Sequence, residues 1–287
     1  MGARLACLTG VCLGVAVPLG GCLAHPDFNG RDRLTDWTAY TLPARDFQAG
    51  VGLIGTGLDD IGASGRFEAG VVEGLQLGTN VVHDAFGIVN VAAKYAAPEV
   101  SRFTFAGGLG FKWTNPKVIW VLPRDQRDRL SDVNAFMVPV SVTASWAPLS
   151  WMGAHLRLGY TWLGIDGAVS SDDALFAGGG NEHDLYVQPT LTFYPLHGWA
   201  IVAGAQIPVY AYMEAGGQVA TSPVPGVVVG GGAEAGRELD VRRKNTIYVA
   251  TQLCWGKTNL RLSATYGLRV FEAQAGFLPA AEVFWRF

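Results

Sequence analysis

Apolar and polar side chains alternate at every second position through most of the chain from residue 46 onward. In the stretch 135–146, one side of an extended chain would carry large apolar groups such as Val140 and Trp146, and the other would carry Ser141 and Thr143. A period of two predicts β-strands. Strands of about ten residues with one wholly apolar face are typical of strands that cross a membrane in a barrel.

The runs of alternation and the breaks between them predict an all-β protein, a transmembrane antiparallel up-and-down β-barrel of twelve strands. Ten strands remain an alternative, because the fifth run is short and one of the outer turns is brief. The predicted strands lie near residues 46–57, 66–81, 88–97, 101–113, 118–122, 134–146, 152–165, 184–194, 199–213, 244–255, 259–271 and 279–287.

The lengths of the connections predict which end of the barrel faces the periplasm, because bacterial barrels have short periplasmic turns and longer outer loops. Short connections are expected at 114–117, 147–151, 195–198 and 256–258, and long loops at 123–133, 168–183 and 216–243. Tryptophan favours the membrane interface, so a periplasmic aromatic girdle is expected from the residues beside the short turns, Trp113, Trp146, Trp151, Trp199 and Trp255.

Composition supports a surface that faces lipid. Charged residues make up 16% of the chain, against about 25% in soluble domains. No stretch after residue 24 offers the ~18 uninterrupted apolar residues of a spanning helix. A closed barrel is the other structure that satisfies every backbone group in lipid. With a formal net charge of −3, no nucleic-acid partner is expected.

The first residues are typical of a secretory signal, with one cation at Arg4, then an apolar run, then small residues. The end of this segment, Leu19–Cys22, resembles a bacterial lipobox, which implies cleavage before Cys22 and its lipidation. An ordinary cut after Ala24 is the alternative. The predicted organisation is a signal peptide at 1–21, a periplasmic tether at 22–45 and the barrel at 46–287. Cys254 would then stand alone, without an intramolecular disulfide.

The final strand carries apolar residues to the last position, with Val283, Trp285 and Phe287 on one face. This ending resembles the C-terminal signal that the barrel-assembly machinery reads, and residues 46–287 as a whole resemble a bacterial outer-membrane β-barrel of no particular subfamily. The resemblance implies a location in the bacterial outer membrane. It also implies the assembly machinery, membrane lipid and lipopolysaccharide as partners.

Strand parity predicts a cationic lumen, and therefore a narrow, anion-preferring pore. A structural or surface-binding barrel without conductance is the alternative, because side chains and loops can fill a lumen. A lipid hydrolase is a third hypothesis. No histidine stands in a His-x-Ser arrangement on a strand, so an enzyme is not expected. The cations predicted to face the lumen are Lys94, Arg102, Lys112, Arg157, Arg261, Arg269 and Arg286, opposed by Glu68 and Glu282.

Two further segments suggest chemistry but lack the necessary spacing. The acidic stretch 170–184 has no EF-hand pattern of oxygen ligands, so a solvated outer loop with loose divalent-cation contacts to lipopolysaccharide is expected. The glycine-rich stretch 226–236 lacks the Gly-Lys-Ser/Thr ending of a phosphate loop. Neither a metal site nor a cofactor is predicted.

Overall fold

A single β-sheet makes up most of the described part of the computed structural model. The one helix in the part described, α2 (Val81–Ala85), is five residues long, and no helix there is long and apolar enough to cross a membrane. The structure describes residues 34–53, 63–115, 117, 124, 133–171, 174–224, 227–238, 245–268 and 276–287. The predicted signal peptide and Cys22 lie outside these residues.

The described residues form thirteen strands, and each pairs antiparallel with its neighbours. They are β1 (Phe47–Leu53), β2 (Ala63–Val72), β3 (Leu75–Asn80), β4 (Ile88–Ala96), β5 (Phe103–Thr114), β6 (Asn134–Leu149), β7 (Met152–Ser171), β8 (Ala174–Leu196), β9 (Trp199–Val224), β10 (Val227–Glu238), β11 (Thr246–Trp255), β12 (Thr258–Leu268) and β13 (Gly276–Arg286).

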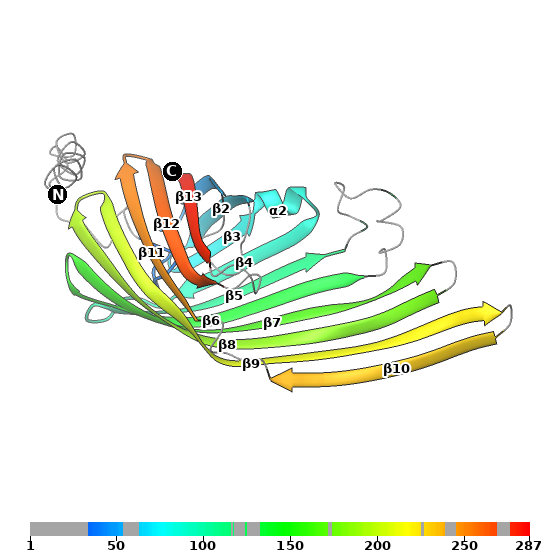
Figure 1. Cartoon of the computed structure of the whole chain (residues 1–287). Helices are drawn as coiled ribbons and strands as arrows, with labels where there is room; N and C mark the ends of the chain where they lie inside the picture. Colours follow the sequence, from blue (N-terminus) through cyan, green and yellow to red (C-terminus); the bar gives the residue numbers. More distant parts are fainter. Residues whose placement is uncertain are drawn as a thin grey trace, which may run out of the picture.

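Twelve of these strands form a closed barrel, as the alternation predicted (Figure 1). The first and last strands, β1 and β13, pair with each other, and β8 pairs with β9. The last residue takes part in this closure, because Phe47 and Phe287 exchange backbone hydrogen bonds of 3.1 and 2.9 Å. The remaining strand, β10, lies outside the ring and pairs with the far half of β9.

The predicted number of strands in the ring, twelve, is correct, although two of the predicted strands that make up this number are wrong. The predicted strand 66–81 is a hairpin of β2 and β3, turning at Gly74, whose φ is +80°. Only Glu73 and Gly74 mark this turn in the sequence, so residues 66–81 were predicted as one continuous apolar strand. The predicted strand 118–122 lies outside the described residues, and β5 pairs directly with β6, which leaves no strand between them in the sheet.

Two of the predicted outer loops belong largely to strands. Residues 168–171 and 174–183 extend β7 and β8, and much of 216–243 forms the end of β9 and β10. These strands continue well past the other strands of the ring (Figure 1). These stretches were predicted as loops because they are rich in glycine and small side chains. Hydrogen bonding to a neighbouring strand decides their conformation instead.

The turns after β2, β4, β6, β8 and β11 lie at one end of the barrel, together with Phe47 and Phe287. Backbone hydrogen bonds join strand ends to neighbouring turns there, for example from Ala147 N–H to the Arg102 carbonyl (3.0 Å) and from Cys254 N–H to the Gly198 carbonyl (2.7 Å). We call this the turn end. Trp113 does not belong to it: β5 begins at the turn end and Trp113 lies at its other end, opposite Phe136.

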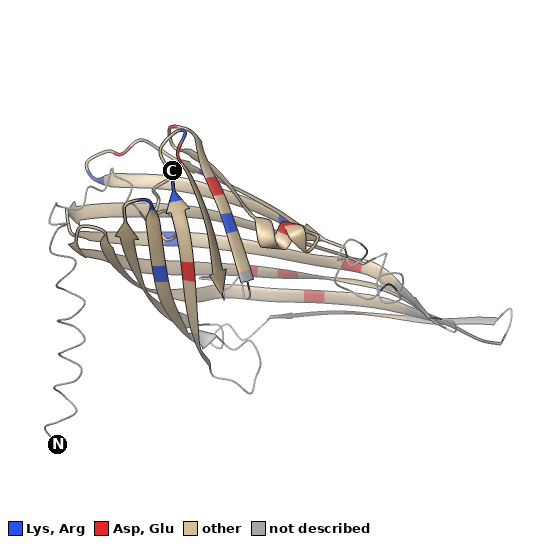
Figure 2. Ribbon diagram, turned by 90° about the horizontal axis from the view of Figure 1, so that it is seen from above, with Lys and Arg blue, Asp and Glu red and all other residues tan. Residues whose placement is uncertain are grey.

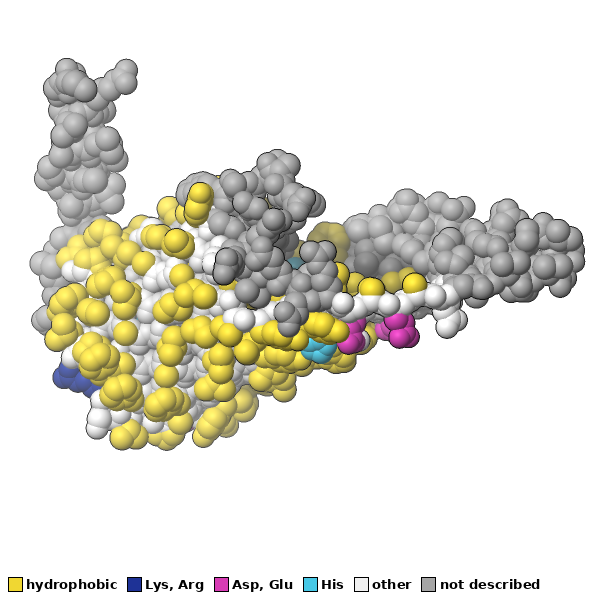
Figure 3. Space-filling model, turned by 60° about the horizontal axis from the view of Figure 1, so that its bottom comes forward, with side chains coloured by type: hydrophobic (Ala, Val, Ile, Leu, Met, Phe, Trp, Pro, Cys, Tyr) yellow, Lys and Arg dark blue, Asp and Glu magenta, His cyan; other side chains and the backbone are white. Residues whose placement is uncertain are grey.

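The outer surface of the ring is apolar. Side chains such as Val51, Phe105 and Leu156 are exposed, while the residues between them on each strand are buried or small. Apolar groups spread across the outside of the barrel in the space-filling view (Figure 3). Exposing such a surface to water is energetically unfavourable, whereas contact with lipid tails is favourable.

Candidate functional site: a plugged lumen

The inner wall is polar, and it includes most of the cations predicted to face it. Lys94, Arg157 and Arg261 lie on the inner wall, and Lys112 shares the inward face of β5 with the buried Thr104. Arg102 was predicted wrongly. It lies exposed in the turn between β4 and β5, where its φ of +68° takes it out of the strand alternation. Arg269 lies outside the described residues.

The predicted tether is wrong for its described part. Residues 34–45, here called the plug, lie inside the barrel, and almost every residue from Leu34 to Leu42 is buried. Leu34 and Trp37 pack against apolar side chains of β8, β9 and β11. The Trp37 ring stacks on that of Tyr248 with the centroids 6.1 Å apart.

The other end of the plug is attached to the opposite wall. Leu42 N–H donates to Gln76 Oε1 on β3 (2.9 Å), and Arg45 N–H donates to the Gly70 carbonyl on β2 (2.7 Å). Gly70 is needed for this approach, because a Cβ atom there would lie 1.9 Å from the Pro43 carbonyl oxygen. The plug therefore crosses the lumen from β2 and β3 to β8, β9 and β11.

A buried ionic network holds the middle of the plug. Asp36 contacts Arg66 Nη1 at 2.7 Å and Arg261 Nη1 at 2.5 Å. Both arginines also contact Glu282 at 2.9 Å. The strands β12, β13, β1 and β2 follow one another in the ring, and Figure 2 shows basic and acidic positions on neighbouring strands. Burial alone would raise the pKa of Asp36, but Arg261 and Arg66 outweigh it and hold that pKa well below its usual range.

Two further cations bind the backbone of the plug. Lys94 Nζ donates to the carbonyl oxygens of Thr35 (2.6 Å), Thr38 (2.7 Å) and Tyr40 (2.5 Å). Arg157 donates to the Asp36 carbonyl. Three carbonyl dipoles satisfy all three donors of an ammonium group, so Lys94 fixes the fold of the plug as well as its position.

A serine and a histidine also meet on the inner wall. Ser145 Oγ and His155 Nδ1 are 2.7 Å apart, and His155 Nε2 is 3.0 Å from Thr192 Oγ1. The plug covers this pair: Ala39 N–H donates to Ser145 Oγ (2.7 Å), and the Tyr40 ring packs edge-on to His155. The pair faces the lumen, whereas a lipid hydrolase needs its nucleophile where lipid can reach it.

Sequence reasoning missed several residues that build this site. Asp36 fell in the predicted tether, and no periodic pattern marks it there. Arg66 has the same parity as the inward Glu68, a signal that could have found it, but it stood at the predicted start of a strand. Tyr248 and Ser145 alternate correctly with their neighbours and have partners on the wall, and their contacts with the plug could not be foreseen from that alternation.

The predicted assembly residues lie on the outer face of β13. Trp285 and Phe287 are exposed, and Val283 is partly exposed. Their neighbours Phe284 and Arg286 point inward and are buried. Within the described part of the chain, no three His, Cys, Asp or Glu side chains gather as metal ligands.

A closed twelve-strand barrel with an apolar outer surface and a polar, ionic lumen is the architecture of bacterial outer-membrane β-barrels. The protein belongs to this class, and the bacterial outer membrane is its location. No family model matches the chain, and no curated protein matches its sequence.

Solved structures of outer-membrane proteins resemble it distantly. The toluene transporter TodX of Pseudomonas putida is 8% identical, with 92% of this chain and 94% of that chain covered and a TM-score of 0.41. The ferric citrate transporter FecA is 13% identical over 85% of this chain and 42% of that chain, with a TM-score of 0.36. The outer-membrane protease OmpT of Escherichia coli is 7% identical over 87% and 96%, with a TM-score of 0.34. At these scores the class rests on the barrel itself.

Proposed function

We propose that the protein is a gated pore that the plug holds closed, and that the open pore prefers anions. The observation that carries this proposal is the plug itself, which crosses the lumen and is held in its middle by ionic and hydrogen-bonded contacts. Water can replace such contacts when the segment withdraws, so the closed state can be reversible.

The charges around the plug support the anion preference. Among the described residues near it, the wall carries more cations than carboxylates, and Asp36 of the plug supplies a further negative charge. Withdrawal would remove Asp36 and the carbonyls that bind Lys94 and Arg157. Fixed positive charge beside a low-dielectric wall enriches anions. The wall cations are Arg66, Lys94, Arg157, Arg261 and Arg286, and the wall carboxylates are Glu68 and Glu282.

Planar-bilayer recordings test the proposal. The wild-type protein should be closed most of the time, and a variant that lacks residues 34–42 should conduct steadily. In a potassium chloride gradient, the reversal potential of that variant should show chloride preference. A deletion variant that inserts as a folded barrel and does not conduct would disprove the pore.

The second candidate is a closed barrel that binds other molecules at the cell surface. The projecting parts of β7–β10 favour it, because these strands continue well past the other strands of the ring. The same recordings separate the two candidates, since a surface-binding barrel needs no conducting state.

A further inference from the structure

The strand β10 forms an edge of the sheet. It pairs with β9 and, among the described strands, with no other. Natural edge strands are commonly blocked by proline, charged side chains or a covering element. The strand β10 contains no proline and no lysine, and its charged residues are Glu234, Arg237 and Glu238. The residues from Gly232 to Gly236 are exposed. The edge therefore offers backbone N–H and C=O groups to a further strand.

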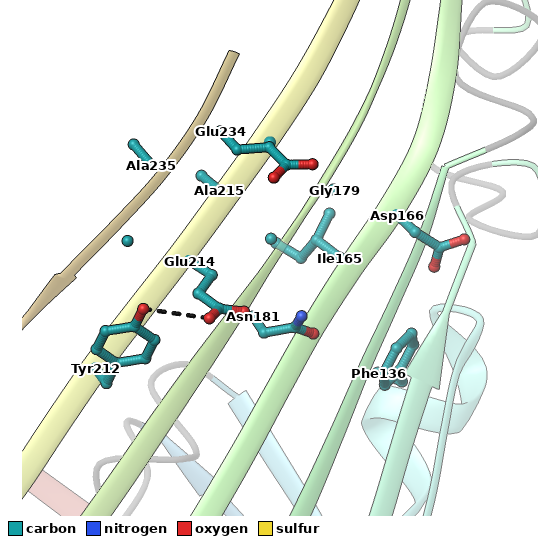
Figure 4. Close-up of a pocket in the computed structure, with 13 residues that line it drawn as sticks. Phe136, Ile165, Asp166, Gly179, Asn181, Tyr212, Glu214, Ala215, Glu234 and Ala235 are labelled. Atoms are coloured by element: carbon teal, nitrogen blue, oxygen red, sulfur yellow. Dashed lines mark hydrogen bonds between the residues drawn. The ribbon is translucent and has the colours of Figure 1, made fainter. Parts of the chain in front are cut away.

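The outer face of the sheet beside this edge is acidic. Glu234 on β10 stands opposite Gly216 of β9, and Glu214 stands opposite Gly236, so both carboxylates lie on one face. Asp166 of β7 is on the same face, two strands further on, opposite Gly179. Figure 4 shows the three carboxylates distributed over the sheet.

Glycines between the carboxylates leave a hollow. Gly179, Gly216 and Gly236 carry no side chain, and with Phe136, Asn181 and Tyr212 they line a depression of about 500 Å³. Tyr212 Oη donates to Glu214 Oε1 at 3.2 Å (Figure 4). In the part of the chain that the structure describes, no arginine or lysine forms a salt bridge with these carboxylates.

We propose that this edge and its acidic face bind an extended polypeptide segment with basic residues at alternate positions. The segment adds as the next strand beside β10, and its backbone supplies the hydrogen bonds. Because side chains alternate along a strand, its basic groups all lie on the face of Glu234 and Glu214. A second copy of this chain fits less well, because it would bring another set of carboxylates to the same edge.

The proposal can be tested with the full-length protein in zwitterionic detergent. The probe is a fluorescein-labelled nine-residue peptide of alternating lysine and valine, and fluorescence anisotropy measures its binding. Two further peptides carry N-methyl groups at the odd or at the even positions. One of the two patterns blocks the hydrogen bonds to β10 and should abolish binding, while the other should leave it nearly unchanged.

Variants test the acidic face independently. The double substitution Glu214→Gln and Glu234→Gln should weaken binding about tenfold, since two exposed ion pairs are lost. The control Glu73→Gln removes an exposed carboxylate at the turn end and should have no effect. No binding of the parent peptide, equal binding of both N-methylated peptides, or full binding to the double variant would each overturn the proposal. None of these outcomes bears on conductance, so the pore is tested separately.

Discussion

Asp36 is the residue on which the closed lumen depends most. Its carboxylate joins Arg66 and Arg261, which are held together with Glu282 on three different strands. The Arg261 side chain is fully buried, and its guanidinium also lies over the Trp37 ring at 4.7 Å. Removing one partner from such a group leaves a buried charge without compensation, which costs more than the pair itself contributes.

Asp36→Asn should therefore destabilise the closed state by about 3 kcal/mol, the lower range for a broken buried ion pair. The expected result in planar bilayers is a strong increase in the open fraction. Asp46→Asn is the matched control, because Asp46 lies at the foot of β1 outside this network. Equal closure of Asp36→Asn and wild type would show that the network does not hold the plug.

Closure should be insensitive to mild acid. The pKa of Asp36 is lowered in the closed state, so its stabilising effect is complete above the ordinary value of ~3.9 and is lost only as pH falls towards the lowered pKa. Conductance recorded from pH 8 to pH 5 should show the same closed fraction. Opening that begins near pH 6 would mean that another group controls the plug.

Gly70 provides a steric test of the position of the plug, because it lies against Pro43 at one end of the plug. Gly70→Ala places a methyl group 1.9 Å from the Pro43 carbonyl oxygen in the closed geometry, so the plug must shift and leakage through the barrel should rise. Gly107→Ala is the control, because a Cβ atom there has no neighbour within 4 Å. Dye efflux from vesicles measures leakage through both variants. Equal efflux through Gly70→Ala and Gly107→Ala would show that the plug does not lie against Gly70.

At the scale of elements, Phe287, which directly follows β13, helps to close the barrel. Phe287 pairs with Phe47 at the seam between the first and last strands, and their rings stack with centroids 4.9 Å apart. Lys257 Nζ also lies over the Phe287 ring at 5.1 Å. The outward face of β13 is thus part of barrel closure as well as a candidate assembly signal.

Deletion of Phe287 should reduce the amount of barrel inserted in the outer membrane several-fold, because both the seam and the predicted signal lose their last residue. Heat-modifiable mobility of membrane fractions on gels measures folded, inserted protein. Phe287→Tyr keeps an aromatic ring and serves as the control. Normal insertion after the deletion would disprove a role of the terminal residue in assembly.

For the whole molecule, the balance of charge around the lumen should set ion preference. In the variant that lacks residues 34–42, Arg157→Gln together with Arg261→Gln should shift the reversal potential towards cations and weaken its dependence on salt, because fewer fixed charges enrich chloride. Heat-modifiable mobility confirms that the barrel is folded. Unchanged selectivity would mean that these arginines do not face the conducting path.

Much of the barrel could be predicted from local patterns. Alternation placed Val140, Trp285 and Leu156 outside and Lys94, Arg157 and Arg261 inside, because a strand has a period of two and lipid accepts only apolar groups. The prediction that Arg102 faces the lumen was wrong, because its positive φ interrupts the alternation one residue before β5 begins. The hairpin at Gly74 was not predicted, because its two turn residues do not visibly interrupt the apolar run in the sequence.

The sequence by itself determined the class of the protein, since a barrel strand carries its two environments in its own side chains. Only the tertiary structure decided that residues 34–45 fill the lumen and that the glycine-rich stretches are long strands. Both depend on partners far away in the chain: Asp36 is 225 residues from Arg261 in sequence, yet its carboxylate is 2.5 Å away. The plug has no periodic face to bury, so its position follows from ion pairs, carbonyl contacts and the packing of Leu34 and Trp37, all of which exist only once the barrel has closed.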